Sequence, residues 1–364
     1  MKLLYVTDAF AVYGGIERVL AEKMNYLSDH LGYEVVLLTV NQGEHTPSFP
    51  LHPLIKHVDL NVRMHRQYEF RGLKRYSIHR QLVAQLKDKL KQALLQINAD
   101  VIVCAKLDFI GVLNEVGSSA PLVVESHTLC KADHYEGVGL LRRLHVWGYK
   151  RQVKHADAVV ALTSGDAEDW RAYNKNVFVI PNVVLLNETS NYSSCTEKRI
   201  VFVGRYTKQK DFDSLLSIWK IVYGRHSDWT LDVYTDRGVE APGVRDFKPV
   251  ANIKEKYNDS SILLLTSLFE PFGLVLPEAM SCGLPVVSFD CPYGPADIIT
   301  DGVDGFLIKN RDILAFADRV CQLIEDKELR LRMGQAAIKS AQRYRADVIM
   351  PKWKELFEHL CRKE

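Results

Sequence analysis

The sequence predicts an α/β protein with two doubly wound domains, and three observations support this prediction. Short, nearly continuous apolar runs alternate with amphipathic segments, which is typical of a parallel sheet covered by helices on both faces. The chain of 364 residues is about twice the usual size of one domain. The alternating pattern also starts again at Arg199, after a polar stretch. We therefore expect ligand-binding loops at the carboxyl ends of the strands in each half.

In the first half, the expected strands are the apolar runs Leu3–Thr7, Glu34–Val40, Asp100–Ala105, Leu122–Glu125 and Ala158–Ala161. A helix over Ile16–His30 follows the first of them. The polar segment Leu186–Glu197 is expected to link the two domains. In the second half, the expected strands are Ile200–Val203, Thr230–Tyr234, Ser261–Thr266 and Pro285–Ser288, with a helix over Asp213–Tyr223.

The composition excludes several classes of protein. A net charge of +2 gives no reason to expect nucleic acid as a partner. Seven scattered cysteines without a Cys-x-x-Cys pair argue against a disulfide scaffold or a zinc site and favour a reducing cytoplasm. The start of the chain has no signal-peptide pattern, and no apolar stretch is long enough to span a membrane. Peripheral membrane contact stays open.

The glycine pair Gly14–Gly15 follows the first expected strand and opens a helix. Glycines there let backbone N–H groups approach a phosphate or a sugar, and the amino end of a helix favours negative charge. The pair does not form the G-x-G-x-x-G fingerprint of dinucleotide-binding proteins. The alternative interpretation is a tight turn that caps the helix.

Gly204 and Arg205, followed by Lys208 and Lys210, come directly after the first expected strand of the second half. Arg supplies a planar fork and Lys a point charge, and both suit a diphosphate leaving group. The alternative is a solvated basic loop, but the position at the carboxyl end of a strand favours a binding function.

The strongest motif runs from Glu270 to Glu278. Gly273 permits a close turn, and a helix is expected to begin near Leu274, so that the N–H groups of Leu274 and Val275 face an anion. Two carboxylates on either side of this turn can bind hydroxyl groups at two ends of one ligand. Two ordinary surface glutamates are the alternative.

His127 follows the expected strand that ends at Glu125, where it could hydrogen-bond a substrate hydroxyl or be tied to the backbone. Asp211 and Asp213 imitate an Asp-x-Asp metal motif. Because they precede a helical pattern, we expect Asp213 to cap that helix, and we expect no metal site.

In combination these motifs resemble family 4 of the retaining GT-B glycosyltransferases, over essentially the whole chain. The matching strings are GGIE at 14–17, SHT at 126–128, IPN at 180–182, GRYTKQK at 204–210 and E-x7-E at 270–278. The resemblance implies two Rossmann-like domains that face each other across a cleft. These would be an acceptor-binding domain over 1–185 and a domain over 186–345 that binds the nucleotide sugar, and a final helix at 346–364 would return to the first domain.

The resemblance also implies roles for individual residues. The implied donor contacts are Arg205 and Lys210 to the diphosphate, Glu270 to the transferred sugar, Glu278 to the ribose, Gly15 to the phosphate or sugar, and His127 near the sugar's 6-hydroxyl. Such enzymes retain the anomeric configuration and need no metal or other cofactor. The segment 291–299 resembles a variant common in bacterial enzymes that use UDP-galactose, UDP-N-acetylgalactosamine or related donors. Val183 stands where many relatives carry glycine.

The expected acceptor is a glycan or a polyprenyl-diphosphate-linked glycan of a surface polysaccharide. Arg63–Lys91 contains nine Lys or Arg against two acids, and Leu140–Lys154 contains five with no acid, together with Trp147 and Tyr149. Basic residues interleaved with aromatic ones suit an anionic membrane surface, so a place at the inner face of the cell membrane is possible. A solvated helix face with Trp147 in the core is the alternative. A nucleotide-sugar epimerase, a phosphorylase and a non-catalytic binding protein on the same fold are the competing functions.

Overall fold

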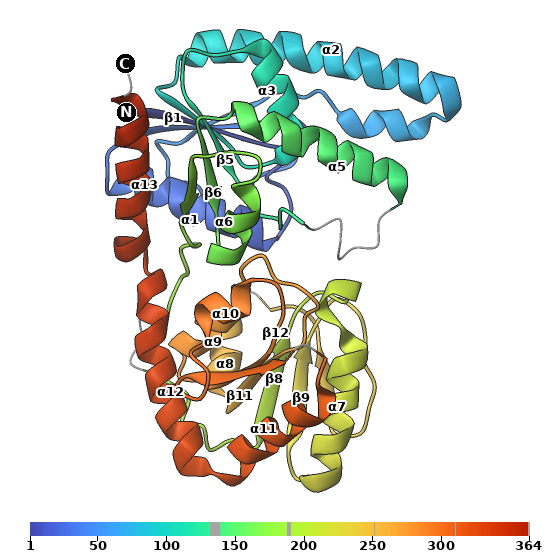
Figure 1. The fold of residues 1–364 in the computed structure, drawn as a ribbon, viewed down its shortest axis with the longest axis vertical. Helices are drawn as coiled ribbons and strands as arrows, with labels where there is room; N and C mark the ends of the chain where they lie inside the picture. Colours follow the sequence, from blue (N-terminus) through green and yellow to red (C-terminus); the bar gives the residue numbers. More distant parts are fainter. Residues whose placement is uncertain (132–138, 188–190, 251, 310, 363–364) are drawn as a thin grey trace. The chain divides into compact units, whose positions relative to one another are not determined.

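The computed structural model describes residues 1–131, 139–187, 191–250, 252–309 and 311–362 (Figure 1). It divides the chain into two compact units, each built on one parallel sheet, which confirms the predicted fold class. The first unit contains Met1–Leu162, Asp166–Val183 and Ile349–Glu364. The second contains Thr163–Gly165 and Val184–Val348. Residues 188–190 of the expected linker lie outside the described residues.

The first unit has a seven-stranded parallel sheet with the order β3-β2-β1-β4-β5-β6-β7. Its strands are β1 (Lys2–Thr7), β2 (Glu34–Thr39), β3 (Lys56–Asp59), β4 (Val101–Cys104), β5 (Leu122–Glu125), β6 (Ala158–Ala161) and β7 (Val177–Val179). The strand order reverses direction between β1 and β4. In folds of this kind the loops after the two strands at such a reversal border the ligand-binding crevice.

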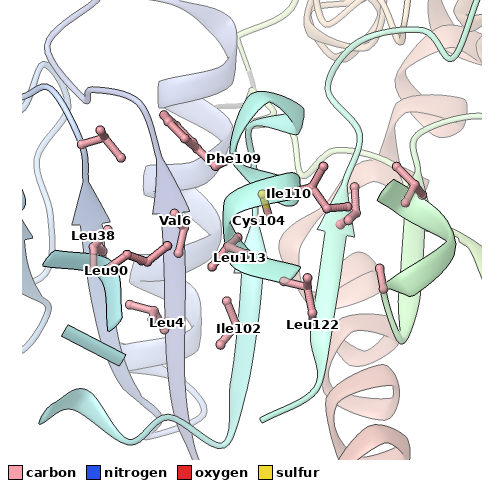
Figure 2. Close-up of a cluster of buried hydrophobic side chains, with 14 of the residues drawn as sticks. Leu4, Val6, Leu38, Leu90, Ile102, Cys104, Phe109, Ile110, Leu113 and Leu122 are labelled. Carbon is pink, nitrogen blue, oxygen red and sulfur yellow. The ribbon is translucent and has the colours of Figure 1, made fainter. Parts of the chain in front are cut away.

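Helices cover both faces of this sheet. They are α1 (Gly15–Asp29), α2 (Gly72–Ile97), α3 (Ile110–Val116), α5 (Leu140–Gln152), α6 (Ser164–Trp170) and α13 (Ala346–Cys361). Figure 2 shows Leu4, Val6 and Ile102 of the strands against side chains of α2 and α3, among them Leu90, Ile110 and Leu113. Burying a side chain of this size stabilises the fold by about 2 kcal/mol.

The strand residues between these point to the opposite face, because successive side chains of a strand alternate. Tyr5 of β1 lies on that face. The ammonium group of Lys23 from α1 is 5.1 Å from the Tyr5 ring centroid and 4.0 Å from that of Trp353 on α13. Helices α1 and α13 therefore pack together on this side. By the same alternation Val123 and Glu125 of β5 point toward α1, which places one carboxylate in this part of the core.

The second unit has a six-stranded parallel sheet with the order β10-β9-β8-β11-β12-β13. Its strands are β8 (Arg199–Val203), β9 (Thr230–Tyr234), β10 (Val244–Phe247), β11 (Ile262–Leu265), β12 (Val286–Asp290) and β13 (Gly305–Lys309). Its helices are α7 (Phe212–Arg225), α8 (Ile253–Asn258), α9 (Val275–Ser281), α10 (Gly294–Ile298), α11 (Ile313–Glu325) and α12 (Lys327–Ala341). Here the strand order reverses between β8 and β11, so the loops after those strands border the expected ligand crevice.

The described part of the expected linker that follows residue 190 packs onto the second unit. The N–H of Ser193 donates to the carbonyl of Cys282 (2.8 Å), and the guanidinium of Arg330 donates to the carbonyl of Cys195 (2.8 Å). Cys195 is itself buried. This polar segment is therefore fixed by hydrogen bonds although it forms no helix or strand.

The expectation that Asp213 caps α7 is wrong, because the helix begins at Phe212 and Asp213 is already inside its first turn. Asp211 is the N-cap, and its carboxylate accepts hydrogen bonds from the N–H (3.4 Å) and the hydroxyl (2.6 Å) of Ser214. Arg311 also contacts the Asp211 carboxylate. Asp213 lies exposed in the first turn, where its charge still suits the helix dipole.

Within the described residues, every helix is too short or too polar to traverse a lipid bilayer.

Candidate active site

The carboxyl edge of β8 and β11 gathers the predicted donor-binding residues of the second unit. Gly204 and Arg205 follow β8, and Glu270 lies five residues beyond the end of β11. Lys210 ends a short 3-10 helix over Lys208–Lys210. The strand order places β8 next to β11, so these loops leave the same edge of the sheet, where the sequence analysis expected binding residues.

Lys210 and Glu270 contact each other directly. The Lys210 ammonium group forms an ion pair with Oε1 of Glu270, and the Ser267 hydroxyl donates to the same oxygen at 2.6 Å. Both side chains are largely buried, with 16% of Lys210 and 6% of Glu270 exposed. A charge pair with this little solvent is held in one geometry by its hydrogen bonds. Sequence reasoning found both residues but missed Ser267 and the pairing.

Gly204 makes room for Lys210. A Cβ atom at Gly204 would lie 3.3 Å from both Cδ and Cε of Lys210. The aliphatic stem of the lysine therefore crosses the glycine, and a side chain at position 204 would require this stem to shift by a few tenths of an ångström. Arg205 next to it is exposed, with its guanidinium available to an anionic ligand. The pKa of Asp236 is lowered by the hydrogen bond from the Tyr206 N–H and, to a lesser extent, by the charge of Arg205.

The turn after Glu270 has the shape that its glycine predicts. Gly273 has φ +91°, a left-handed conformation that favours glycine, and α9 begins two residues later with Leu274 as its N-cap. The N–H groups of Leu276 and Glu278 donate to the carbonyls of Gly273 (2.9 Å) and Leu274 (3.2 Å). The N–H groups of Leu274 and Val275 precede these and have no acceptor inside the helix. Glu278 is buried on α9.

The segment after β12 holds the backbone of Glu270. The Glu270 N–H donates to the carbonyl of Pro292 (2.6 Å), and the Glu270 carbonyl accepts from the N–H groups of Tyr293 (3.0 Å) and Gly294 (2.9 Å). A Cβ atom at Gly294 would lie 1.9 Å from the carbonyl oxygen of Phe272. Glycine is required there by close approach of two backbones, so the string at 291–294 has a structural role in fixing Glu270.

In the first unit, the glycine pair opens α1 as predicted. Gly14 is the N-cap with an extended backbone, and Gly15 is the first helical residue. A Cβ atom at Gly14 would lie 2.3 Å from a carboxylate oxygen of Glu17, so that side chain folds back over the turn. Glu17 therefore supplies the negative charge at this end of the helix.

His127 lies just beyond β5 in a buried charged cluster. Its Nε2 is 3.4 Å from Oε1 of Glu125, and Lys23 forms an ion pair with the other oxygen of that carboxylate. Burial raises the pKa of Glu125, but the charges of Lys23 and His127 and their hydrogen bonds outweigh it and lower this pKa to about 2. Burial lowers the pKa of Lys23, and the Glu125 charge opposes that change.

Lys23 and Glu125 were missed at the sequence level, although one signal was present. Lys23 lies four residues from both Val19 and Leu27, which are buried on the inner face of α1. A lysine on the apolar face of an amphipathic helix needs a buried partner. The sequence alone does not show that this partner is Glu125, because 102 residues separate the two.

A second buried carboxylate supports the loop that carries His127. Asp166 accepts hydrogen bonds from the N–H of Cys130 (2.7 Å) and the indole N–H of Trp170 (3.0 Å). The same indole is 3.2 Å from the hydroxyl of Ser126. Burial raises the pKa of Asp166 to about 6, and these hydrogen bonds oppose the shift.

Comparison with known proteins identifies the class of this chain. Residues 13–188 match the family described as "Glycosyltransferase Family 4", and residues 197–326 match "Glycosyl transferases group 1". Two Rossmann-like units with this arrangement of motifs are those of a GT-B glycosyltransferase. The chain belongs to the family 4, or group 1, glycosyltransferases, and the resemblance seen in the sequence is confirmed.

Among its relatives is the amylovoran biosynthesis glycosyltransferase AmsD of Erwinia amylovora, which is 28% identical over 98% of this chain and 99% of AmsD. Two solved structures share the fold at low identity. A Staphylococcus aureus TarM mutant in complex with fondaparinux, α-GlcNAc-glycerol and UDP has a TM-score of 0.78 and 15% identity, over 98% of this chain and 99% of TarM. The lipopolysaccharide outer core galactosyltransferase WaaB has a TM-score of 0.74 and 19% identity, over 99% and 100% of the two chains.

Proposed function

We propose that this glycosyltransferase moves a hexose or an N-acetylhexosamine from a UDP-sugar to a glycan or lipid-linked glycan during synthesis of a surface polysaccharide. The observation that carries the proposal is the cluster at one edge of the second unit. There Arg205, the Lys210–Glu270 ion pair and the buried Glu278 lie on loops at the carboxyl ends of β8 and β11 or on the helix that follows. Two cations for a diphosphate and two carboxylates for hydroxyl groups are what a nucleotide sugar requires.

The comparisons support the choice of donor and acceptor. UDP is bound in the TarM complex, WaaB is named as a galactosyltransferase, and AmsD is named for the biosynthesis of the polysaccharide amylovoran. We therefore favour UDP over other nucleotides and a galactose-, N-acetylgalactosamine- or glucose-type sugar. The family match supports transfer rather than epimerisation, phosphorolysis or binding without chemistry.

The proposed reaction retains the configuration of the anomeric carbon and uses no metal ion. Arg205 and Lys210 stabilise the negative charge that develops on the departing diphosphate. As the bond from the anomeric carbon to the diphosphate breaks, the acceptor hydroxyl forms the new bond from the same face. A phosphate oxygen of the leaving group takes the hydroxyl proton. Glu270, held by Ser267 and Lys210, orients the sugar and does not attack it.

A donor screen by thermal unfolding tests this function. A ligand that binds the folded protein at 100 times its Kd stabilises it by about 2.7 kcal/mol. We expect UDP and at least one UDP-hexose to raise the midpoint, and GDP-mannose to have little effect. Product NMR should then show transfer with the donor's anomeric configuration, at a rate unaffected by EDTA. Failure of every nucleoside diphosphate to stabilise the protein contradicts the proposed donor site.

We further propose that the first unit touches an anionic membrane at the cytoplasmic face. Trp147 on α5 is 52% exposed and its ring lies 4.7 Å from the Arg151 guanidinium, so the alternative that it lies in the core is wrong. On and before α2, Leu73 and Tyr68 are exposed and the Arg75 guanidinium is 4.6 Å from the Tyr68 ring. Exposed aromatic and apolar side chains beside cations suit a lipid interface.

Flotation with liposomes checks the membrane proposal. The protein should float with vesicles that contain phosphatidylglycerol and stay in solution with phosphatidylcholine alone, and high salt should weaken its binding. Trp147→Ala should reduce flotation, whereas Leu314→Ala, an exposed apolar position on the second unit, should not. Equal flotation with both vesicle types would contradict binding to an anionic membrane and would favour a soluble acceptor.

A further inference from the structure

The two strands that lead into the proposed donor site stop pairing before their loops begin. The ladder between β8 and β11 ends with the pair Val201 and Leu263, although the strands run on to Val203 and Leu265. The chain after β8 then turns toward the other neighbouring strand, because the N–H of Gly204 donates to the last carbonyl of β9 (3.1 Å). The sheet itself therefore does not hold the loop after β8 against the loop after β11.

Hydrogen bonds outside the sheet join these two loops. Thr266 follows β11 directly, and its hydroxyl donates to the carbonyl of Lys210 (2.9 Å). The N–H of Leu268 donates to the carbonyl of Gln209 (2.7 Å), and the Gln209 side-chain amide donates to the carbonyl of Phe269 (2.9 Å). Thr266 is fully buried and Gln209 is half-buried. The loops are thus linked in both directions, and each link ends on a main-chain oxygen.

These links lie directly beside the two charged groups of the site. One of them ends on Lys210 itself, and another ends on Phe269, the residue before Glu270. A buried carbonyl needs a donor, but a donor from its own loop would meet that need equally well. Here each donor comes from the facing loop. A shift of one loop would therefore break these bonds and separate the Lys210 ammonium group from the Glu270 carboxylate.

We propose that Thr266 and Gln209 are positioning residues of the donor site: their hydrogen bonds to the facing loop keep Lys210 beside Glu270. This inference rests on the proposed function, in which the lysine serves the leaving diphosphate and the glutamate serves the sugar. Thr266 acts from the core without touching the substrate. A misplacement of about 1 Å at a reacting centre can lower the rate by about a hundredfold, so a small movement of these loops is enough to affect turnover.

The test removes one hydroxyl and compares two ends of the same strand. Thr266→Val removes the hydroxyl that bonds Lys210, and Thr266→Ser keeps it. Ser260, just before β11, is the matched control, because it is 1% exposed and its hydroxyl donates to the carbonyl of Lys256 (2.7 Å).

We expect Thr266→Val to lower kcat for a UDP-sugar by about tenfold, with a smaller change in KM. Thr266→Ser and Ser260→Ala should keep most of the turnover. Wild-type kcat in Thr266→Val contradicts the proposal. A tenfold loss in Ser260→Ala also contradicts it, because the effect would then follow from the loss of any buried hydroxyl.

A double-variant comparison separates positioning from a general structural role. In a Lys210→Met background, Thr266→Val should lower kcat no further, because residues that act through one another are not additive. The same fold loss in both backgrounds would overturn the proposal. Gln209→Met removes the other side-chain bond at a half-buried position, so it serves even if Thr266→Val does not fold. It should lower kcat in the same way, and wild-type kcat in this variant would count against the inference.

Urea unfolding tests the ion pair without any substrate. In a Thr266→Val background, Lys210→Met should destabilise the protein less than it does alone, because the lysine is already displaced from Glu270. Equal destabilisation in the two backgrounds would overturn the inference whether or not the protein transfers sugar. Absence of any transfer by the wild-type protein would instead contradict the function proposed above, and the unfolding result would still decide whether Thr266 positions Lys210.

Discussion

The ammonium group of Lys210 forms an ion pair with Oε1 of Glu270, so the cation predicted for the diphosphate is in contact with the carboxylate predicted for the sugar. In the proposed donor site, this pair would hold the side chain for the diphosphate next to the side chain for the sugar. Each residue thereby depends on the other for stability as well as for chemistry, because a lone charge at this depth would lack a counter-charge.

Removing one member of this pair should therefore affect stability and activity differently from removing both. Lys210→Met should lower the free energy of unfolding by about 3 kcal/mol, because it leaves the buried Glu270 carboxylate without its counter-charge. Lys210→Met/Glu270→Gln should recover most of that loss, because the Gln carbonyl still accepts from Ser267. Both variants should lose turnover by about a hundredfold. Urea unfolding and UDP-sugar transfer are the two measurements, and full recovery of turnover in the double variant would contradict the donor role.

Arg205 tests the diphosphate site without this coupling, because its side chain is exposed and outside the ion pair. Arg205→Ala should reduce turnover by about a hundredfold and leave the unfolding midpoint within the range of ordinary surface substitutions. Arg332→Ala on α12, also an exposed arginine, is the matched control and should behave as wild type. Wild-type turnover in Arg205→Ala would remove this residue from the mechanism.

Gly204 and Gly224 form a second matched pair. A Cβ atom at Gly204 would lie 3.3 Å from Cδ and Cε of Lys210, whereas a Cβ atom at Gly224 in α7 would have no other atom within 4 Å. Gly204→Ala should displace Lys210 and raise the KM for the donor. Gly224→Ala should leave kinetics unchanged and stabilise the protein by about 0.5–1 kcal/mol through helix propensity. Steady-state kinetics with a UDP-sugar decides, and an unchanged KM in Gly204→Ala would show that the lysine can move freely.

The sequence predicts the central strands well and the edges poorly. The four strands absent from the sequence analysis are β3, β7, β10 and β13, and these are the edge strands of the two sheets. A central parallel strand is buried on both faces and reads as a continuous apolar run. Edge strands such as Lys56–Asp59 and Val244–Phe247 are partly exposed and carry charged residues, so their pattern resembles a loop.

The same limit applies to the site. Site residues at strand ends and glycine turns could be predicted from short motifs, because the residues that set the local backbone conformation are only a few positions away in the sequence. The ion pair between Lys210 and Glu270 joins residues 60 positions apart, and the contact of Lys23 with Glu125 joins residues 102 positions apart. Such pairings depend on how the sheet brings two loops together, which hydrophobic periodicity does not encode.

Asp166 gives a pH prediction with a defined sign. Burial raises the pKa of its carboxyl from 3.8 to about 6. The folded protein therefore binds this proton more tightly than the unfolded chain, and the associated stability, present below pH 3.8, is lost as the pH rises through 6. This contribution amounts to at most about 3 kcal/mol.

In Asp166→Asn this part of the pH dependence should be absent, so the free energy of unfolding of the wild type should fall relative to that of the variant between pH 4 and about 6, and the two should run parallel above it. Urea unfolding at several pH values gives the difference. Asp88→Asn, an exposed carboxylate on α2, should show no such change. Parallel curves for Asp166→Asn across the whole range would mean that its carboxyl titrates normally.

The start of α7 offers a direct comparison between two aspartates, because the sequence favours Asp213 as the cap and the structure has Asp211 in that place. Asp211→Ala should lower the free energy of unfolding by about 2 kcal/mol. It removes the carboxylate that accepts hydrogen bonds from Ser214 and pairs with Arg311, and it places alanine at φ +50°. Asp211→Asn should cost less, since asparagine tolerates this conformation and still caps. Asp213→Ala should change stability by no more than about 0.5 kcal/mol. Thermal or urea unfolding of the three variants is sufficient, and a larger loss for Asp213→Ala than for Asp211→Ala would place the helix start where the sequence alone had suggested it.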